Sequence, residues 1–162
     1  METHATPQFV IGQMRVLTIS EMSFFHVSSQ PIPFSDLDKV LDPLLENLYA
    51  AKAQANLIDG GPDVTRYYRI SESDLYQMEV GVSVKPGTQP AGDAKIKTLA
   101  PLQCAGLLLW GSLAHIAQAY STLTQTMKDA GMQHTGECQE WNYYFESVDS
   151  PNNVMGIYMG IR

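Results

Sequence analysis

The stretch from Cys138 to Ser147 holds the side chains best suited to chemistry, because polar and bulky apolar residues alternate along it. Successive side chains of a β-strand point to opposite faces. One face would carry Glu140, Asn142, Tyr144 and Glu146, and the other Trp141, Tyr143 and Phe145. If the apolar set packs against helices, the polar set lines the uncovered face. Carboxylates beside an aromatic wall select a flat organic cation, although a solvated sheet face shows the same alternation.

Two other segments contribute to the predicted face. One tyrosine of the Tyr67-Tyr68 pair must point away from the helices, and Glu79 lies on the side opposite to the valines that follow it. Trp110 comes just before a Gly111-Ser112 turn and suits either a groove or the core. The predicted ligand-binding set is Tyr68, Glu79, Trp110, Glu140, Asn142 and Tyr144.

The sequence motifs of common cofactor and metal sites are missing. There is no glycine-rich phosphate loop, no HExxH pair and no GxSxG elbow. The four histidines are scattered, and His26, which follows two phenylalanines, is interpreted as a hydrogen-bonded core residue. Cys104 and Cys138 have no metal-ligand spacing, which favours buried, reduced thiols. We therefore expect no cofactor and no metal.

The charge balance narrows the choice of partners. The 162 residues include 10 Lys and Arg against 17 Asp and Glu, which gives a net charge of −7. This acidity argues against direct nucleic-acid binding, which needs a basic face, and favours cations or a partner protein. The longest apolar run, from Ala105 to Trp110, is too short for a membrane span, and no signal peptide is evident, so a cytoplasmic location is predicted.

The elements that must position these residues follow the same order twice. Each half begins with a β-rich segment, at Gln13 and at Ile96, and continues into a helix. The first helix runs from a possible capping box at Ser35 to about Asn56, with a kink or a new start at Pro43; the second runs from Ser112 to Gly131. Two strands close each half, at positions 64–70 and 75–84, then 138–147 and 154–161.

This order predicts a duplicated β-α-β-β chain. The expected halves are 13–85 and 94–162, joined by a Pro- and Gly-rich linker at 86–93, in a single domain 13–162 that follows a flexible leader 1–12. The fold class is α+β: a pseudo-twofold antiparallel sheet with two helices on one face and a ligand groove on the other.

Several segments together resemble GyrI-like small-molecule-binding domains, which are also the effector modules of multidrug-responsive bacterial regulators. The resemblance rests on Leu99–Gly106, Trp110–Leu113, Ala119-Tyr120 with Leu123, the Gly131 stop, Gly61-Pro62 before Tyr67-Tyr68, and Glu79–Val84. It extends from Gln13 to Ile161. It implies a groove that binds hydrophobic, often cationic and aromatic molecules.

The chain departs from this family at two positions. The family's groove glutamate in a Trp-Glu-x-Tyr strand corresponds to Asn142, and its histidine two residues before a glycine corresponds to Leu109. One branch of the family is similar to hydrolases of cyclopropane-bearing toxins that use a groove Glu and Tyr. Because an asparagine cannot accept the proton, such chemistry here would need Glu140 or Glu79 as the base, with Tyr144 to orient the substrate.

Three functions are therefore considered. The leading one is a stand-alone binding protein for hydrophobic, cationic aromatic small molecules. The second is a hydrolase with Glu140 and Tyr144 as candidate catalytic residues. The third is an inhibitor of a DNA-handling enzyme whose acidic face imitates nucleic acid. The sequence does not specify an oligomeric state.

Overall fold

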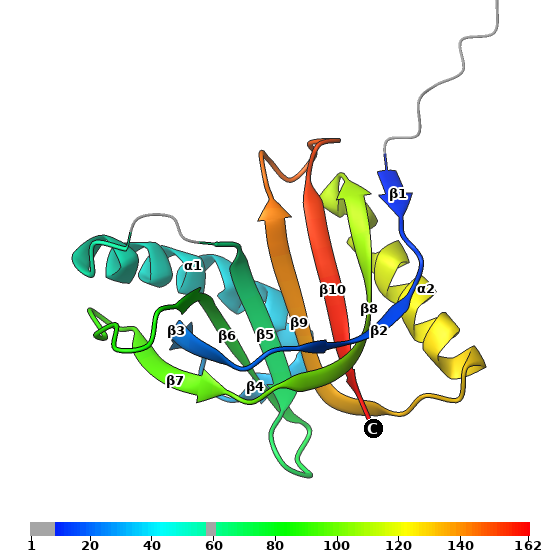
Figure 1. Ribbon diagram of the computed structural model, residues 1–162, viewed down its shortest axis with the longest axis horizontal. Helices are drawn as coiled ribbons and strands as arrows, with labels where there is room; N and C mark the ends of the chain where they lie inside the picture. Colours follow the sequence, from blue (N-terminus) through cyan, green and yellow to red (C-terminus); the bar gives the residue numbers. More distant parts are fainter. Residues whose placement is uncertain (1–8, 58–60) are drawn as a thin grey trace, which may run out of the picture.

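The computed structural model describes residues 9–57 and 61–162. Ten strands form one antiparallel sheet, and two helices pack on it, so the fold is α+β, as predicted (Figure 1). The first strands and helix are β1 (Phe9–Ile11), β2 (Arg15–Ile19), β3 (Met22–Ser28), β4 (Ile32–Pro33) and α1 (Leu37–Gln54). The others are β5 (Asp63–Arg69), β6 (Leu75–Val84), β7 (Lys95–Leu99), β8 (Leu102–Gly111), α2 (Ile116–Asp129), β9 (His134–Tyr144) and β10 (Val154–Ile161).

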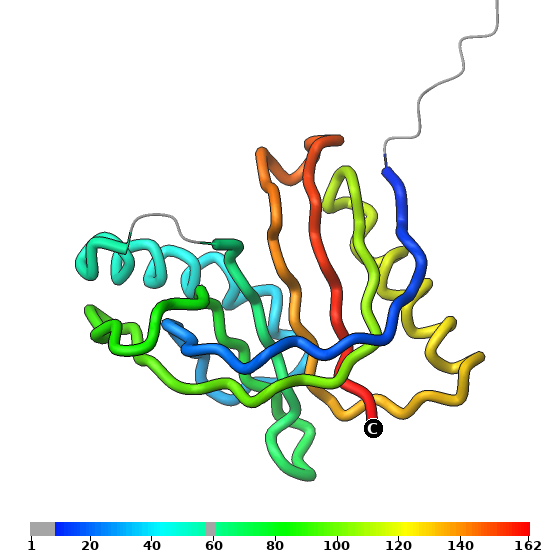
Figure 2. The backbone as a smooth tube through the Cα atoms, viewed as in Figure 1, coloured from blue at the N-terminus to red at the C-terminus, as the bar shows by residue number. Residues whose placement is uncertain are grey.

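The strand order is symmetric about one junction. Along the sheet, β3, β6 and β5 of the N-terminal part meet β9, β10 and β8 of the C-terminal part, and β5 pairs with β9 at the centre. The two parts also exchange strands, because β2 pairs with β8 and β7 pairs with β3. Figure 2 shows the two chain segments that make these exchanges running side by side across the molecule.

Both helices cover the same face of the sheet. Leu44 and Leu48 of α1 pack on Val80 and Val82 of β6, and α2 packs on Leu107 and Leu109 of β8 and on Ile157 of β10 through the residues Ala119, Leu123 and Met127. Tyr67 contacts both clusters from the central strand β5. The two predicted helices are confirmed, and the buried residues of each lie on one stripe.

The ends of the helices differ from the sequence prediction in three details. A short 3-10 turn, Phe34–Asp36, precedes α1, and no side-chain cap forms there, so the predicted capping box is absent. The helix is continuous through Pro43, six residues after its first residue, and does not restart at Asp42. Ser112 does act as a cap, accepting a hydrogen bond from the Ala114 amide, but it caps the 3-10 turn Leu113–His115 before α2.

The predicted leader 1–12 is corrected in part. Residues 1–8 lie outside the described residues, but Phe9–Ile11 form strand β1, which pairs antiparallel with Gly111, Trp110 and Leu109 of β8. Phe9 also stacks on the His115 ring at 3.8 Å. No helix in the described part of the chain is long and apolar enough to cross a membrane.

The close approach of β3 and β6 depends on a glycine. A Cβ atom at Gly81 would overlap the backbone carbonyl oxygen of Phe25, and both strands are held by neighbours on either side. We expect Gly81→Ala to lower the free energy of unfolding by at least about 1–3 kcal/mol, as overpacking does. Gly61→Ala is the matched control, because its Cβ would meet no atom within 4 Å. Urea unfolding of both variants tests this, and equal stabilities would contradict it.

Candidate functional site

A groove on the helix-bearing face is the candidate site. A cavity of about 320 Å³ lies between the two helices, above the central strands. Its walls come from Leu41, Asp42, Leu45 and Tyr49 of α1, from Leu113 and Ile116 at the start of α2, and from Phe145 and Val148 after β9. Its floor consists of Asp63, Thr65, Glu140, Asn142 and Met155. We call this the acidic cavity, because three carboxylates and no lysine or arginine line it.

The register of β5 and β9 sets the floor of this cavity. Thr65 lies opposite Glu140, and Asp63 lies opposite Asn142. All four therefore point to the same side, towards the helices. This finding corrects the predicted position of the groove: the sequence placed it on the face away from the helices, whereas residues of both helices line it.

Glu140 is a half-buried carboxyl group on the floor. Tyr120 of α2 donates a hydrogen bond to its Oε2 atom, and Tyr67 donates to the Tyr120 hydroxyl oxygen at 2.9 Å. Burial raises the pKa of Glu140 above that of an exposed glutamate, and the Tyr120 bond offsets only part of this effect. The same burial holds the pKa values of both tyrosines well above their usual range, so these phenols stay neutral.

The mouth of the acidic cavity is apolar and aromatic. Tyr49, Phe145 and Val148 are about half exposed there, at 51%, 52% and 58%. Among the acids, Asp63 is already engaged, because it accepts a hydrogen bond from Tyr49 at 3.2 Å and lies 3.6 Å from the Lys52 ammonium. The described structure gives Glu140 no cationic partner. A group with aromatic rings and a positive charge is the natural complement of this lining.

The structure separates the predicted ligand-binding set. Only Glu140 and Asn142 line the acidic cavity. Tyr68, Glu79 and Trp110 lie on the opposite face, and Tyr144, at the end of β9, is exposed and donates a hydrogen bond to Glu146 at 2.8 Å. The prediction that these residues share one face is therefore wrong. Trp141 and Tyr143, which were expected to meet the helices, point away from them, and Trp141 packs near Phe24 and Val64.

Glu79 belongs to an ionic network on that opposite face. Its side chain is almost fully buried and pairs with Arg66 at 2.6 Å and with Lys97. Arg66 also bonds Glu137 at 2.9 Å, and its guanidinium carbon lies 4.1 Å from the centre of the Tyr68 ring. Although burial opposes ionisation, the two cations hold the pKa of Glu79 below its usual range. Glu79 and Tyr68 are thus engaged in structural contacts.

Two residues of the site were missed by the sequence analysis. Neither Tyr120 nor Tyr67 belongs to the predicted ligand-binding set, although both lie in segments that carry the family resemblance. A possible signal was the presence of a tyrosine in an otherwise aliphatic stripe, because a buried phenol needs a hydrogen-bond partner. His26 is confirmed as a hydrogen-bonded core residue, since its Nδ1 donates to the Phe24 carbonyl at 3.0 Å.

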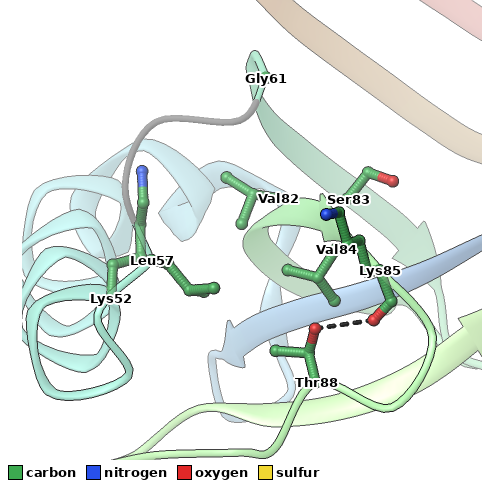
Figure 3. A pocket seen from close by; sticks show the side chains of 8 residues that line it. All are labelled: Lys52, Leu57, Gly61, Val82, Ser83, Val84, Lys85 and Thr88. Carbon is green, nitrogen blue, oxygen red and sulfur yellow. Dashed lines mark hydrogen bonds between the residues drawn. The ribbon is translucent and has the colours of Figure 1, made fainter.

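A smaller cavity offers weaker chemistry. This cavity has a volume of about 240 Å³ and lies between the end of α1 and the end of β6. Lys52 and Leu57 line it together with Val82 and Val84 (Figure 3). Thr88 donates a hydrogen bond to the Lys85 carbonyl at its rim, at 2.7 Å. It contains no carboxylate, and its rim includes Gly61, next to the undescribed residues 58–60. No group of His, Cys, Asp and Glu in the described ranges could hold a metal ion.

Comparison with solved structures identifies the fold. No known family model and no curated protein matches the chain. The C-terminal domain of EcmrR superposes with a TM-score of 0.63 at 15% identity, covering 93% of this chain and 98% of that one. In a complex of EcmrR with DNA the TM-score is 0.65 at 16% identity over 96% of this chain, which spans only 58% of the longer EcmrR chain.

Two further structures have the same fold. SAV2435, solved bound to tetraphenylphosphonium, has a TM-score of 0.71 at 9% identity and covers 93% of this chain and 94% of its own. A hydrolase encoded by lin2189 from Listeria innocua has a TM-score of 0.52 at 11% identity and covers 93% and 92%. At these identities the likeness concerns the fold alone. The chain therefore shares its fold with the C-terminal domain of EcmrR and with SAV2435.

The raised pKa of Glu140 makes stability depend on pH. The folded protein keeps a proton on Glu140 that the unfolded chain releases, so this group's contribution falls as pH rises from the unfolded pKa through the folded one. In Glu140→Gln that decline should disappear, so the variant should gain stability relative to the original protein as the pH rises above the usual range of a glutamate pKa. Denaturant unfolding across this range, with the exposed control Glu72→Gln, measures the effect; parallel pH profiles for the original protein and Glu140→Gln would contradict it.

The ionic network predicts a large stability effect at Arg66. Arg66→Met would remove two ion pairs and leave the buried Glu79 carboxylate with Lys97 as its one lysine or arginine partner among the described residues. We expect a loss of about 3–5 kcal/mol in the free energy of unfolding. The exposed Arg69→Met, which breaks a surface pair with Asp74 and a hydrogen bond to the Ser73 carbonyl, should cost about 0–1 kcal/mol. Thermal or urea unfolding compares the two, and equal losses would rule out a structural role for the network.

Proposed function

We propose that this protein binds hydrophobic, cationic aromatic small molecules in the acidic cavity between α1 and α2. The observation that carries the proposal is the partly buried Glu140 carboxyl on the floor of an aromatic-mouthed cavity with no cationic side chain in its lining. A cationic ligand would provide the positive charge that the protein does not supply. The binding of tetraphenylphosphonium by SAV2435, a protein of the same fold, supports this ligand class.

The ligand's rings and charge would be held by different parts of the cavity. Leu45, Ile116 and Met155 offer apolar contact, and Tyr49 and Phe145 offer ring faces at the mouth. The ligand's charge would approach Glu140, whose ionised form Tyr120 already stabilises. Because the free carboxyl has a raised pKa, binding of a cation should release a proton from it. The affinity for a cation should therefore increase with pH until the pH passes the pKa of Glu140 in the ligand-free protein.

Calorimetric titration with tetraphenylphosphonium tests the proposal. Glu140→Gln keeps the shape and can still accept the Tyr120 hydrogen bond but removes the charge, so we expect a loss of about 1.5–3 kcal/mol, or roughly ten- to a hundredfold in affinity. The control Glu72→Gln, far from the cavity lining, should leave the affinity unchanged. Binding of equal strength by the original protein and Glu140→Gln would overturn the assigned role of Glu140, and no binding at all would overturn the proposed ligand class.

The pair Glu140 and Tyr120 also favours a second function, hydrolysis of a small molecule. A carboxyl of raised pKa next to an apolar wall has the properties of a general base, and a neutral phenol bonded to it can orient water or substrate. The partner is Tyr120, since Tyr144 bonds Glu146 instead. The structure offers no comparable support for an inhibitor of a DNA-handling enzyme, because Glu79 and Glu137 on the other face are paired with cations.

Assays of hydrolysis can separate the two functions. With a cyclopropane-bearing indole as substrate, Glu140→Gln should abolish turnover, and Tyr120→Phe should lower it by about 10²–10⁴-fold. Tyr144→Phe should have no effect, because this exposed phenol does not reach Glu140. Stoichiometric binding without product would favour the binding function alone. A loss of turnover in Tyr144→Phe equal to that in Tyr120→Phe would contradict the assignment of Tyr120.

A further inference from the structure

The groove contains a second cavity beyond Glu140. It measures about 420 Å³ and is bounded by residues from β5, β6, α2, β9 and β10. Four of its lining residues are aromatic: Phe34, Tyr67, Tyr76 and Tyr120; the others are Thr124, His134, Gly136, Cys138 and Met159. We call it the aromatic cavity. Its volume falls in the range of small-molecule sites, roughly 300–1,000 Å³.

A hydrogen-bonded chain separates the two cavities. On β5, Thr65 lines the acidic cavity and Tyr67 the aromatic cavity; on β9, Glu140 lines the first and Cys138 the second. The change from one cavity to the other thus falls where Tyr67 donates to Tyr120 and Tyr120 donates to Glu140. The hydroxyl groups of Tyr67 and Tyr120 make their hydrogen bonds within this partition. Tyr67 and Tyr120 therefore present their rings to the aromatic cavity and direct their polar ends to the partition.

Apart from the imidazole of His134, the lining of the aromatic cavity has no acidic or basic side chain. No carboxylate, lysine or arginine contributes to it, in contrast with the acidic cavity. Burial raises the pKa of the Cys138 thiol to about 12, so the thiol stays neutral. The Phe34 ring packs edge-to-face with the Tyr76 ring, with ring centres 5.2 Å apart, and with the Tyr67 ring, with ring centres 6.3 Å apart. An adjoining cavity of about 310 Å³ shares Thr124, His134 and Met159 with the aromatic cavity, and its other lining residues are Met127, Lys128, Gly131 and Met132.

We propose that the aromatic cavity is a second binding site, for an uncharged aromatic molecule of about two fused rings. Aromatic side chains that surround a cavity bind flat apolar molecules by burial and by edge-to-face contact. Flexible methionine side chains beside them adapt to the shape of the ligand. Without a carboxylate, the site gives no preference to a cation over a neutral ring of the same size. The proposal does not depend on cation binding in the acidic cavity, and the two sites can be tested separately.

The probe is N-phenyl-1-naphthylamine, a neutral naphthalene derivative whose fluorescence rises in apolar surroundings. Thr124 is exposed at the rim on α2, so Thr124→Trp should fold normally and cover the cavity. Gln118→Trp, at an exposed position of the same helix away from the cavity, is the control. We expect Thr124→Trp to weaken probe binding at least about tenfold and Phe34→Ala to weaken it severalfold, while Gln118→Trp changes it less than about twofold.

Cross-tests with tetraphenylphosphonium keep the two proposals apart. Glu140→Gln should leave naphthylamine affinity within about twofold, and Thr124→Trp should leave tetraphenylphosphonium affinity within about twofold. The second site is overturned if the naphthylamine does not bind, if Gln118→Trp weakens it as much as Thr124→Trp, or if Leu45→Trp in the acidic cavity abolishes its binding. Naphthylamine binding without tetraphenylphosphonium binding would support the second site and reject only the proposed function.

Discussion

The pairing of β5 with β9 is the constraint on which the rest of the structure depends. It joins the two parts of the sheet, and its register places Tyr67 opposite Cys138 and Thr65 opposite Glu140. Because alternate residues of a strand face opposite sides, a shift by one residue would exchange the two faces completely. If β9 slipped in this way, Glu140 would lie on the face of the ionic network, and Glu137, an acidic partner of Arg66, would lie under the helices.

The buried charged groups on the two faces of the sheet have different kinds of partner. On the face away from the helices, Glu79, Arg66, Lys97 and Glu137 compensate one another, which makes the cluster part of the fold. Under the helices, Glu140 has only a neutral donor, Tyr120. An ionisable group held in this way is costly to stability when charged, and such groups are common at functional sites. This difference directs attention to the groove between α1 and α2.

The neutral partition divides that groove into regions of different chemistry. One side presents three carboxylates below an aromatic mouth, and the other presents the rings of one phenylalanine and three tyrosines and no carboxylate. Strands β5 and β9 contribute to both cavities. On each strand, one residue lines the acidic cavity and the next residue on the same face lines the aromatic cavity. A duplicated sheet with a helix on each half thus provides a long groove whose chemistry changes within one pair of strands.

The sequence by itself determined the repeated β-α-β-β order and the α+β class, because these follow from local periodicity and from turn residues such as Gly131. It also identified Glu140 and Asn142 as neighbours on one face. Alternation could not decide which face met the helices, and the bulk of Trp141 and Tyr143 suggested the wrong one. Only the tertiary structure decided this, because Trp141 fills a small apolar cluster with Phe24 and Val64 on the far face. The partnership of Glu140 with Tyr120, 20 residues earlier on α2, likewise exists only once the helix packs on the sheet.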